Sequence, residues 1–369
     1  MNKLPSILPV ILLAVITTAY ASDNNTKTPS ETGNESHHSV PFLTLRNKTG
    51  SEDAAEYFGG KRDMLRAGYC DVSRTQFKTL KSIAENVPFY FPEDILKIDS
   101  IAELSIEDFW MDFDKTAGVQ QPILYTHGFY ISFDRGCKRA AEFKRSLDLA
   151  GPFVLFSWPS DGVIVNYTQD EADLYWSVEP LQETLNGMIK RYGAGNINIA
   201  AHSLGTRGIM LALIRIASEK RLTKGANKAL INQLVLLAAD IDAGIFKQYL
   251  PQIKPLVKNI SIYVSEHDNP LALSRQLHGY PRLGESGTHL EELDGIEIID
   301  VSDVPVQYPS GHLYHLYNDE VVADLYQLLN KNKPAAERSK LKPSGKNYWR
   351  LQPGIINTPV TTDKSADDR

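Results

Sequence analysis

A serine between two small residues is the first candidate for chemistry in this chain. Ser203 stands in the pentapeptide Ala-His-Ser-Leu-Gly, with an apolar run before it and a helical pattern after it. A sharp turn from strand to helix forces its central residue into a strained backbone conformation, and it needs small residues two positions away on each side. Ala201 and Gly205 meet this need, although alanine replaces the first glycine of the usual G-x-S-x-G pattern. Ser203 is therefore the candidate nucleophile.

A serine hydroxyl barely ionises at neutral pH, so it needs a histidine base and a carboxylate that orients the histidine. Asp268 follows the predicted strand 259–265, and His312 follows the predicted strand 296–301. The order nucleophile, acid, base along the chain is that of α/β-hydrolases, and it differs from the orders in chymotrypsin and subtilisin. We predict a catalytic triad of Ser203, Asp268 and His312.

Other residues compete for the roles of acid and base. Asp240 follows the predicted strand 233–239, one strand earlier than Asp268, and some hydrolases recruit their acid from that position. The alternative is that Asp240 and its neighbour Asp242 cap a short helix that begins near residue 243. His315 lies three residues beyond His312 and is the alternative base, but a glycine-histidine pair on a loop is the better place for one.

The end of the first predicted strand offers backbone donors. Gly128 lets the main chain approach a substrate closely, and the charge that develops on an attacked carbonyl needs preorganised N–H groups. We expect these from Phe129 and Leu204, with His127 as a structural hydrogen-bonding residue.

For Trp158, which precedes a proline, the alternative to a pocket role is a stiff structural turn. The residues that can line the pocket are His127, Gly128, Tyr130, Trp158 and His202.

Apolar runs alternate with helical patterns and predict the elements that position these residues. The predicted strands are 123–126, 153–158, 197–201, 233–239, 259–265 and 296–301, and the predicted helices are 135–149, 171–192, 204–218 and 319–329. Such alternation is typical of an α/β fold with a mostly parallel central sheet, helices on both faces and ligands at the carboxyl ends of the strands. Residues 58–114 are expected to supply antiparallel edge strands and an entry helix.

The two ends of the chain have different compositions from the middle. Lys3, the apolar run 7–16 and the Ala-Tyr-Ala at 19–21 predict a cleavable signal peptide. A membrane anchor is the alternative, but the run is shorter than the ~20 residues that span a bilayer. The expected segments are a signal peptide at 1–21, a flexible polar segment at 22–49, an α/β-hydrolase domain at 50–330 and a polar tail at 331–369. The mature protein is expected to be periplasmic or secreted.

Composition narrows the partners and cofactors. The net charge of -6 makes nucleic acid an improbable partner. Cys70 and Cys137 are the only cysteines, and they can form one disulfide or remain buried thiols. No P-loop, dinucleotide glycine pattern or metal-ligand spacing is present, so we expect no cofactor and no metal. No later stretch is long and apolar enough to span a membrane.

A set of linked motifs is similar to those of the bacterial α/β-hydrolases grouped as DUF900. The motifs lie at 127–133, 156–162, 201–205, 239–242 and 263–268, and the resemblance covers about 57–329. It implies the α/β-hydrolase fold and an esterase-like or lipase-like activity. It also places Ser203, Asp268 and His312 at the positions of the family's triad.

Two functions remain from this reasoning. The first is an exported serine hydrolase that cleaves a small carboxylic ester, or a related thioester or amide, through an acyl-enzyme. The second is a binding protein of the cell envelope that kept the fold without catalysis. Covalent labelling of Ser203 distinguishes them. The oligomeric state is left open.

Overall fold

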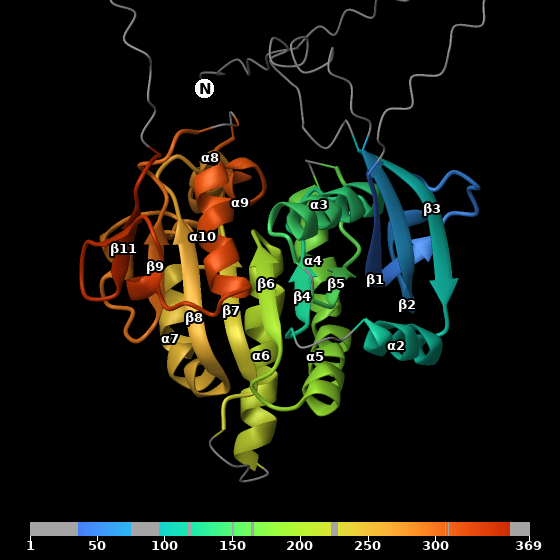
Figure 1. Ribbon diagram of the computed structural model, residues 1–369, viewed down its shortest axis with the longest axis horizontal. Coiled ribbons are helices and arrows are strands. Elements are labelled where there is room, and N and C mark those ends of the chain that lie inside the picture. Colours follow the sequence, from blue (N-terminus) through green and yellow to red (C-terminus); the bar gives the residue numbers. More distant parts are fainter. Residues whose placement is uncertain are drawn as a thin grey trace, which may run out of the picture. The chain divides into compact units, whose positions relative to one another are not determined.

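A long mixed sheet carries the elements of the computed structural model (Figure 1), which describes residues 36–74, 96–116, 120–149, 151–163, 166–222, 228–306, 308 and 310–354. Within these residues the strands are β1 (Ser36–Lys48), β2 (Phe58–Arg74), β3 (Leu96–Leu104), β4 (Ile123–Thr126), β5 (Phe153–Ser157), β6 (Asn198–His202), β7 (Ile231–Leu237), β8 (Val257–Val264), β9 (Glu297–Asp300), β10 (Leu341–Pro343) and β11 (Tyr348–Leu351). The helices are α2 (Ile106–Lys115), α3 (Phe133–Ser146), α4 (Tyr167–Trp176), α5 (Val178–Tyr192), α6 (Gly205–Leu222), α7 (Ala243–Ile253), α8 (Asn269–His278), α9 (Tyr314–Tyr317) and α10 (Asp319–Leu329). The predicted signal peptide lies outside the described residues.

The strand order is β10-β11-β9-β8-β7-β6-β4-β5-β1-β2-β3. Neighbouring strands from β11 to β1 run parallel, whereas β10 at one end and β2 and β3 at the other are antiparallel. The predicted α/β fold with a mostly parallel sheet is confirmed, as are the antiparallel edge strands and the entry helix between residues 58 and 114. Loops after the parallel strands therefore meet at one edge of the sheet.

Two apolar cores cover the two faces of the sheet. In β4, Leu124 packs into the core that includes α5 and α6, while the next residue, Tyr125, packs into the core that includes α3 and α10. Successive side chains of a strand point to opposite faces, so a strand buried on both faces is apolar throughout. This burial explains why the sequence predicts the central parallel strands β4 to β9.

The predicted helix at 171–192 is in fact two helices, α4 and α5, which meet at Ser177. Pro180 stands in the first turn of α5 and has no N–H to give to a carbonyl one turn earlier. An apolar pattern that is continuous in the sequence is therefore divided between two helices. The single-helix prediction was wrong for this reason.

The flexible segment predicted at 22–49 was wrong for residues 36–48, because these residues form β1. This strand lies between β5 and β2, and Val40 and Phe42 are fully buried. The prediction failed because the composition of the whole segment is polar, whereas the apolar side chains of the strand lie in its second half. The sheet therefore begins before the predicted domain boundary at residue 50.

The polar tail predicted from residue 331 was wrong for residues 335–351. A short 3-10 helix at Ala335–Glu337 leads into β10 and β11, and β11 pairs in parallel with β9. Arg338 is buried, with its guanidinium group 2.8 Å from Asp324 Oδ2 and 2.7 Å from Glu297 Oε2. This segment completes the sheet.

The two cysteines form a disulfide that joins β2 to α3. Cys70 and Cys137 are fully buried, and their Cα atoms are 6.5 Å apart. The bond links the antiparallel edge to the helix that follows β4. Of the two sequence-based alternatives, the disulfide is the one that the structure contains.

Candidate active site

Ser203 lies at the turn between β6 and α6, as predicted. Its φ of 52° is in the left-handed region, which is unusual for a residue with a side chain. Its N–H donates to Leu237 O at 2.9 Å, so the turn is tied to the neighbouring strand β7. The residue is 6% exposed. A strained, anchored serine at the end of a central strand is the arrangement expected of a nucleophile elbow.

His312 and Asp268 meet at the same edge of the sheet, although 44 residues separate them. His312 Nδ1 is 2.8 Å from Asp268 Oδ2 and 2.9 Å from Asp268 Oδ1. A carboxylate oxygen accepts in such a contact, so Nδ1 is the donor. Asp268 also accepts from Leu271 N at 3.0 Å as the N-cap of α8, which holds the carboxylate in place.

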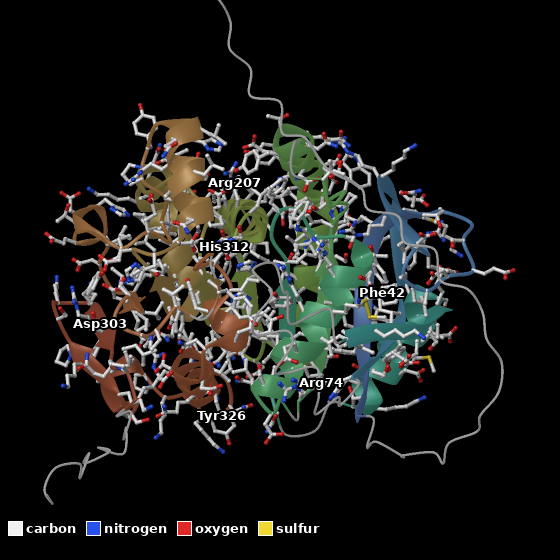
Figure 2. All side chains as sticks on the ribbon, turned by 90° about the horizontal axis from the view of Figure 1, so that it is seen from above. Phe42, Arg74, Arg207, Asp303, His312 and Tyr326 are labelled. Atoms are coloured by element: carbon white, nitrogen blue, oxygen red, sulfur yellow. A yellow bond between two sulfur atoms is a disulfide. The ribbon has the colours of Figure 1, made fainter. Side chains whose placement is uncertain are left out.

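The loop that carries His312 packs against the residue before Ser203. The rings of His202 and His312 are 4.6 Å apart, and His202 Nε2 donates to His312 O at 3.2 Å. Gly311 has a φ of +64°, and a Cβ there would lie 2.0 Å from His267 O, so only glycine lets this loop approach the loop of Asp268. Figure 2 looks down on this edge of the sheet and labels His312.

Asp240, the alternative acid, is bound to other groups. Its Oδ1 accepts from Ser274 Oγ at 2.7 Å and lies 3.0 Å from Arg282 Nε, and its Oδ2 accepts from Tyr167 OH at 2.6 Å. Burial alone would raise the pKa of Asp240, but the Arg207 and Arg282 guanidinium groups outweigh it and hold the pKa below its usual value. The geometry favours Asp268 as the partner of His312.

The neighbouring Asp242 has the alternative role that the sequence suggested. Its side chain accepts from Ile245 N at 3.0 Å and caps the N-terminus of α7. An aspartate at an N-cap satisfies a backbone donor that has no partner within the helix. The helix predicted to begin near residue 243 is confirmed.

His315, the alternative base, is fully buried in α9. Among the described residues, neither of its ring nitrogens has a hydrogen-bond partner. Its ring lies 4.3 Å from that of His202, and burial lowers its pKa well below the usual value. The sequence analysis named all three histidines as candidates, but it did not predict that the ring of His202 lies against those of His312 and His315, since their spacing in the sequence predicts no contact.

Gly128, the residue before the predicted donor Phe129, lies directly beside Ser203. A Cβ on Gly128 would lie 2.6 Å from Ser203 Cβ, so glycine is required for this approach. Tyr130 has a φ of 64°, and its N–H donates to Asp170 Oδ2 at 3.3 Å. Phe129, one of the predicted donors, is therefore held between Gly128 at the serine and the anchored Tyr130.

Trp158 has the structural role rather than an exposed pocket position. It is fully buried, its Nε1 donates to His127 O at 2.9 Å, and its ring stacks on that of His127 at 5.1 Å. The half-buried aromatic residue beside the site is instead Tyr167, whose ring lies 5.1 Å from that of Phe129. Tyr167 was missed because it opens α4, far from any predicted strand end.

The fold and the turn at Ser203 define an α/β-hydrolase. Residues 105–331 match the family described as "Alpha/beta hydrolase of unknown function (DUF900)", and the chain belongs to that family. The strands β1, β2 and β3 precede the matched segment. No curated protein matches the chain.

Solved structures with some similarity include esterases. A candidate esterase from Staphylococcus aureus is 14% identical, with 58% of this chain and 76% of that chain covered and a TM-score of 0.32. An esterase from Pyrobaculum calidifontis is 12% identical, with coverages of 72% and 81% and a TM-score of 0.33.

Proposed function

We propose that this α/β-hydrolase is a serine hydrolase that cleaves a small carboxylic ester, with thioesters and amides as related substrates. Ser203 is the proposed nucleophile, His312 the base and Asp268 the acid. The observation that carries the proposal is the contact of His312 Nδ1 with both oxygens of Asp268, on a loop packed against the elbow of Ser203.

The proposed reaction follows from the proton positions. His312 Nε2 takes the hydroxyl proton as Ser203 Oγ attacks the ester carbonyl, and the N–H groups of Phe129 and Leu204 stabilise the oxyanion. His312 then returns the proton to the leaving alcohol, and an acyl-enzyme remains. A water molecule, activated by His312, then attacks the acyl-enzyme, and the carboxylic acid is released as Ser203 regains its proton. The half-buried rings of Phe129 and Tyr167 offer an apolar surface to the substrate.

Labelling with a fluorophosphonate probe tests the proposal. We expect the probe to modify Ser203 in the wild-type protein, and we expect no modification in Ser203→Ala and a large loss in His312→Ala. The matched control is Ser146→Ala, which removes a serine hydroxyl at the end of α3, where it lies 3.3 Å from Phe143 O, and should leave the labelling unchanged. A folded wild-type protein that stays unlabelled would favour the envelope binding protein without catalysis.

We further propose export to the periplasm or beyond the cell. The signal-like residues 1–21 support it, and a disulfide persists in an oxidising compartment. Among the described residues, no helix is long and apolar enough to span a membrane. Mass spectrometry of the protein from periplasmic and culture fractions tests this proposal, with a mature N-terminus at Ser22 as the expected result.

A further inference from the structure

Arg46 is a buried cation whose role the proposed reaction does not explain. It lies in β1, outside the matched family segment, where the pairing register between β1 and β2 shifts on both sides of it. Such irregularities re-aim a side chain. Arg46 is fully buried, and this burial lowers its pKa to about 9, so the guanidinium group is charged at neutral pH.

The guanidinium group bridges the loops that follow β4 and β5. Its Nη2 donates to Ile131 O at 2.6 Å, its Nη1 to Ser160 O at 2.5 Å and its Nε to Ser157 Oγ at 2.9 Å. The bridge is reinforced by Ile131 N, which donates to Ser160 Oγ at 3.0 Å. None of the hydrogen-bond partners of Arg46 among the described residues is a carboxylate. Its N–H groups thus bind the loops after β4 and β5, and also Gly59 O of β2 at 3.2 Å, rather than a carboxylate.

The same guanidinium group selects the tautomer of His127. Arg46 Nη2 lies 3.4 Å from His127 Nε2, and His127 Nδ1 lies 2.9 Å from Gly128 O. Guanidinium only donates and a carbonyl only accepts, so Nε2 must accept and Nδ1 must carry the proton. Burial, and after it the charge of Arg46, lowers the pKa of His127 well below its usual value, which keeps the ring neutral.

The bond from His127 to Gly128 O orients the next N–H group. The Gly128 carbonyl and the Phe129 N–H belong to one trans peptide group, in which the two bonds point in opposite directions. Holding the carbonyl toward His127 therefore holds the N–H away from it. We propose that Arg46 is a positioning residue that acts through His127 to aim the Phe129 N–H at the oxyanion. This inference rests on the proposed function.

Variants of Arg46 test the inference by a split between kcat and KM. In Arg46→Met we expect kcat on a short p-nitrophenyl ester to fall about 10- to 100-fold with little change in KM, because a misaimed donor affects the transition state and not the bound ester. The inhibition constant of a trifluoromethyl ketone, whose serine adduct carries an oxyanion, should rise by a similar factor. Arg46→Lys should have a kcat and an inhibitor affinity between those of the wild type and Arg46→Met, since a lysine cannot reach both loops and His127 at once.

Arg338→Lys is the matched control. Arg338 is also buried, but it binds Asp324 of α10 and Glu297 of β9, so we expect a loss of stability without a change in kcat or in inhibitor affinity. An Arg46→Met or Arg46→Lys enzyme with wild-type kcat and inhibitor affinity would overturn the inference. If Arg46→Met does not fold, the lysine variant decides.

The tautomer of His127 gives a test that does not depend on turnover. ¹⁵N NMR of the wild-type protein should show His127 neutral with its proton on Nδ1, and Arg46→Lys should weaken or remove that pattern. A proton on Nε2 in the wild type would overturn the inference even in an active enzyme. Absence of labelling at Ser203 in the wild type would instead refute the proposed function.

Discussion

At the scale of single residues, the two competing aspartates differ in what else each one binds. Asp268 offers both oxygens to His312 and one to the first turn of α8. Asp240 lies between Arg207 and Arg282, whose charges it balances inside the protein. A carboxylate that balances buried guanidinium groups is unavailable to orient an imidazole. The roles of the two side chains should therefore separate on substitution.

We expect Asp268→Asn to lower kcat by about 10³- to 10⁴-fold, because an amide at this position favours the wrong tautomer of the histidine. Asp240→Asn should instead lower stability, by about 3 kcal/mol or more, since it leaves buried arginines without their counter-charge. Ester turnover per folded molecule and urea unfolding measure the two effects. Full activity in Asp268→Asn together with its loss in a folded Asp240→Asn would reverse the assignment.

At the scale of elements, the strands nearest the site were predicted best. The strand 123–126 has the predicted bounds of β4, whereas β1 and β11 were hidden within segments of polar composition. A central strand is apolar on both faces, but β11 gains its place by pairing with β9, and no local pattern encodes a pairing partner. The burial of Leu351 nevertheless makes β11 part of the core.

Leu351→Ala in β11 should destabilise the protein by about 2 to 5 kcal/mol, because the leucine is fully buried and its loss leaves a cavity. Lys342→Ala in the neighbouring β10 is the control, and its exposed side chain should matter by less than about 0.5 kcal/mol. Chemical denaturation measures both. Equal stabilities of the two variants would mean that this hairpin is not part of the cooperative fold.

At the scale of the whole molecule, two features make stability depend on conditions. One is the disulfide between β2 and α3, which joins residues 67 positions apart and constrains the unfolded chain. The other is a set of buried histidines, His127, His202 and His315, whose pKa values burial lowers well below 6.5. Both features change the difference in free energy between the folded and the unfolded state.

Replacing both cysteines, as Cys70→Ser with Cys137→Ser, should lower the free energy of unfolding by about 2 to 4 kcal/mol. The reason is that the unfolded chain regains the freedom that the bond removes. Unfolding of the wild type with and without reductant provides the control, and the reduced wild type should resemble the double variant. No difference between the oxidised and reduced wild type would contradict the expectation.

Stability should fall as the pH drops below about 6.5, the usual pKa of histidine. The unfolded histidines bind protons there while the folded ones do not, so each group lowers stability by up to about 1.4 kcal/mol per pH unit until its folded pKa is reached. Urea unfolding between about pH 7.5 and 5.5 measures how steeply the free energy of unfolding changes with pH around the usual pKa of histidine. His315→Leu should make it shallower, and the exposed His267→Ala is the matched control. An unchanged slope in His315→Leu would show that this histidine is protonated in the folded protein.

Local residue types alone determined the strand-turn-helix at Ser203, the chain order of the candidate nucleophile, acid and base, and the parallel sheet. These features depend on residues that are close in the sequence: small residues permit the turn at Ser203, and apolar runs predict the buried strands. Only the tertiary structure decided that His312 binds Asp268 rather than Asp240 and that Arg46 contacts His127. These contacts join residues 44 and 81 positions apart. They form because strands that are far apart in the sequence lie close together in the sheet, and no local pattern in the sequence predicts this arrangement.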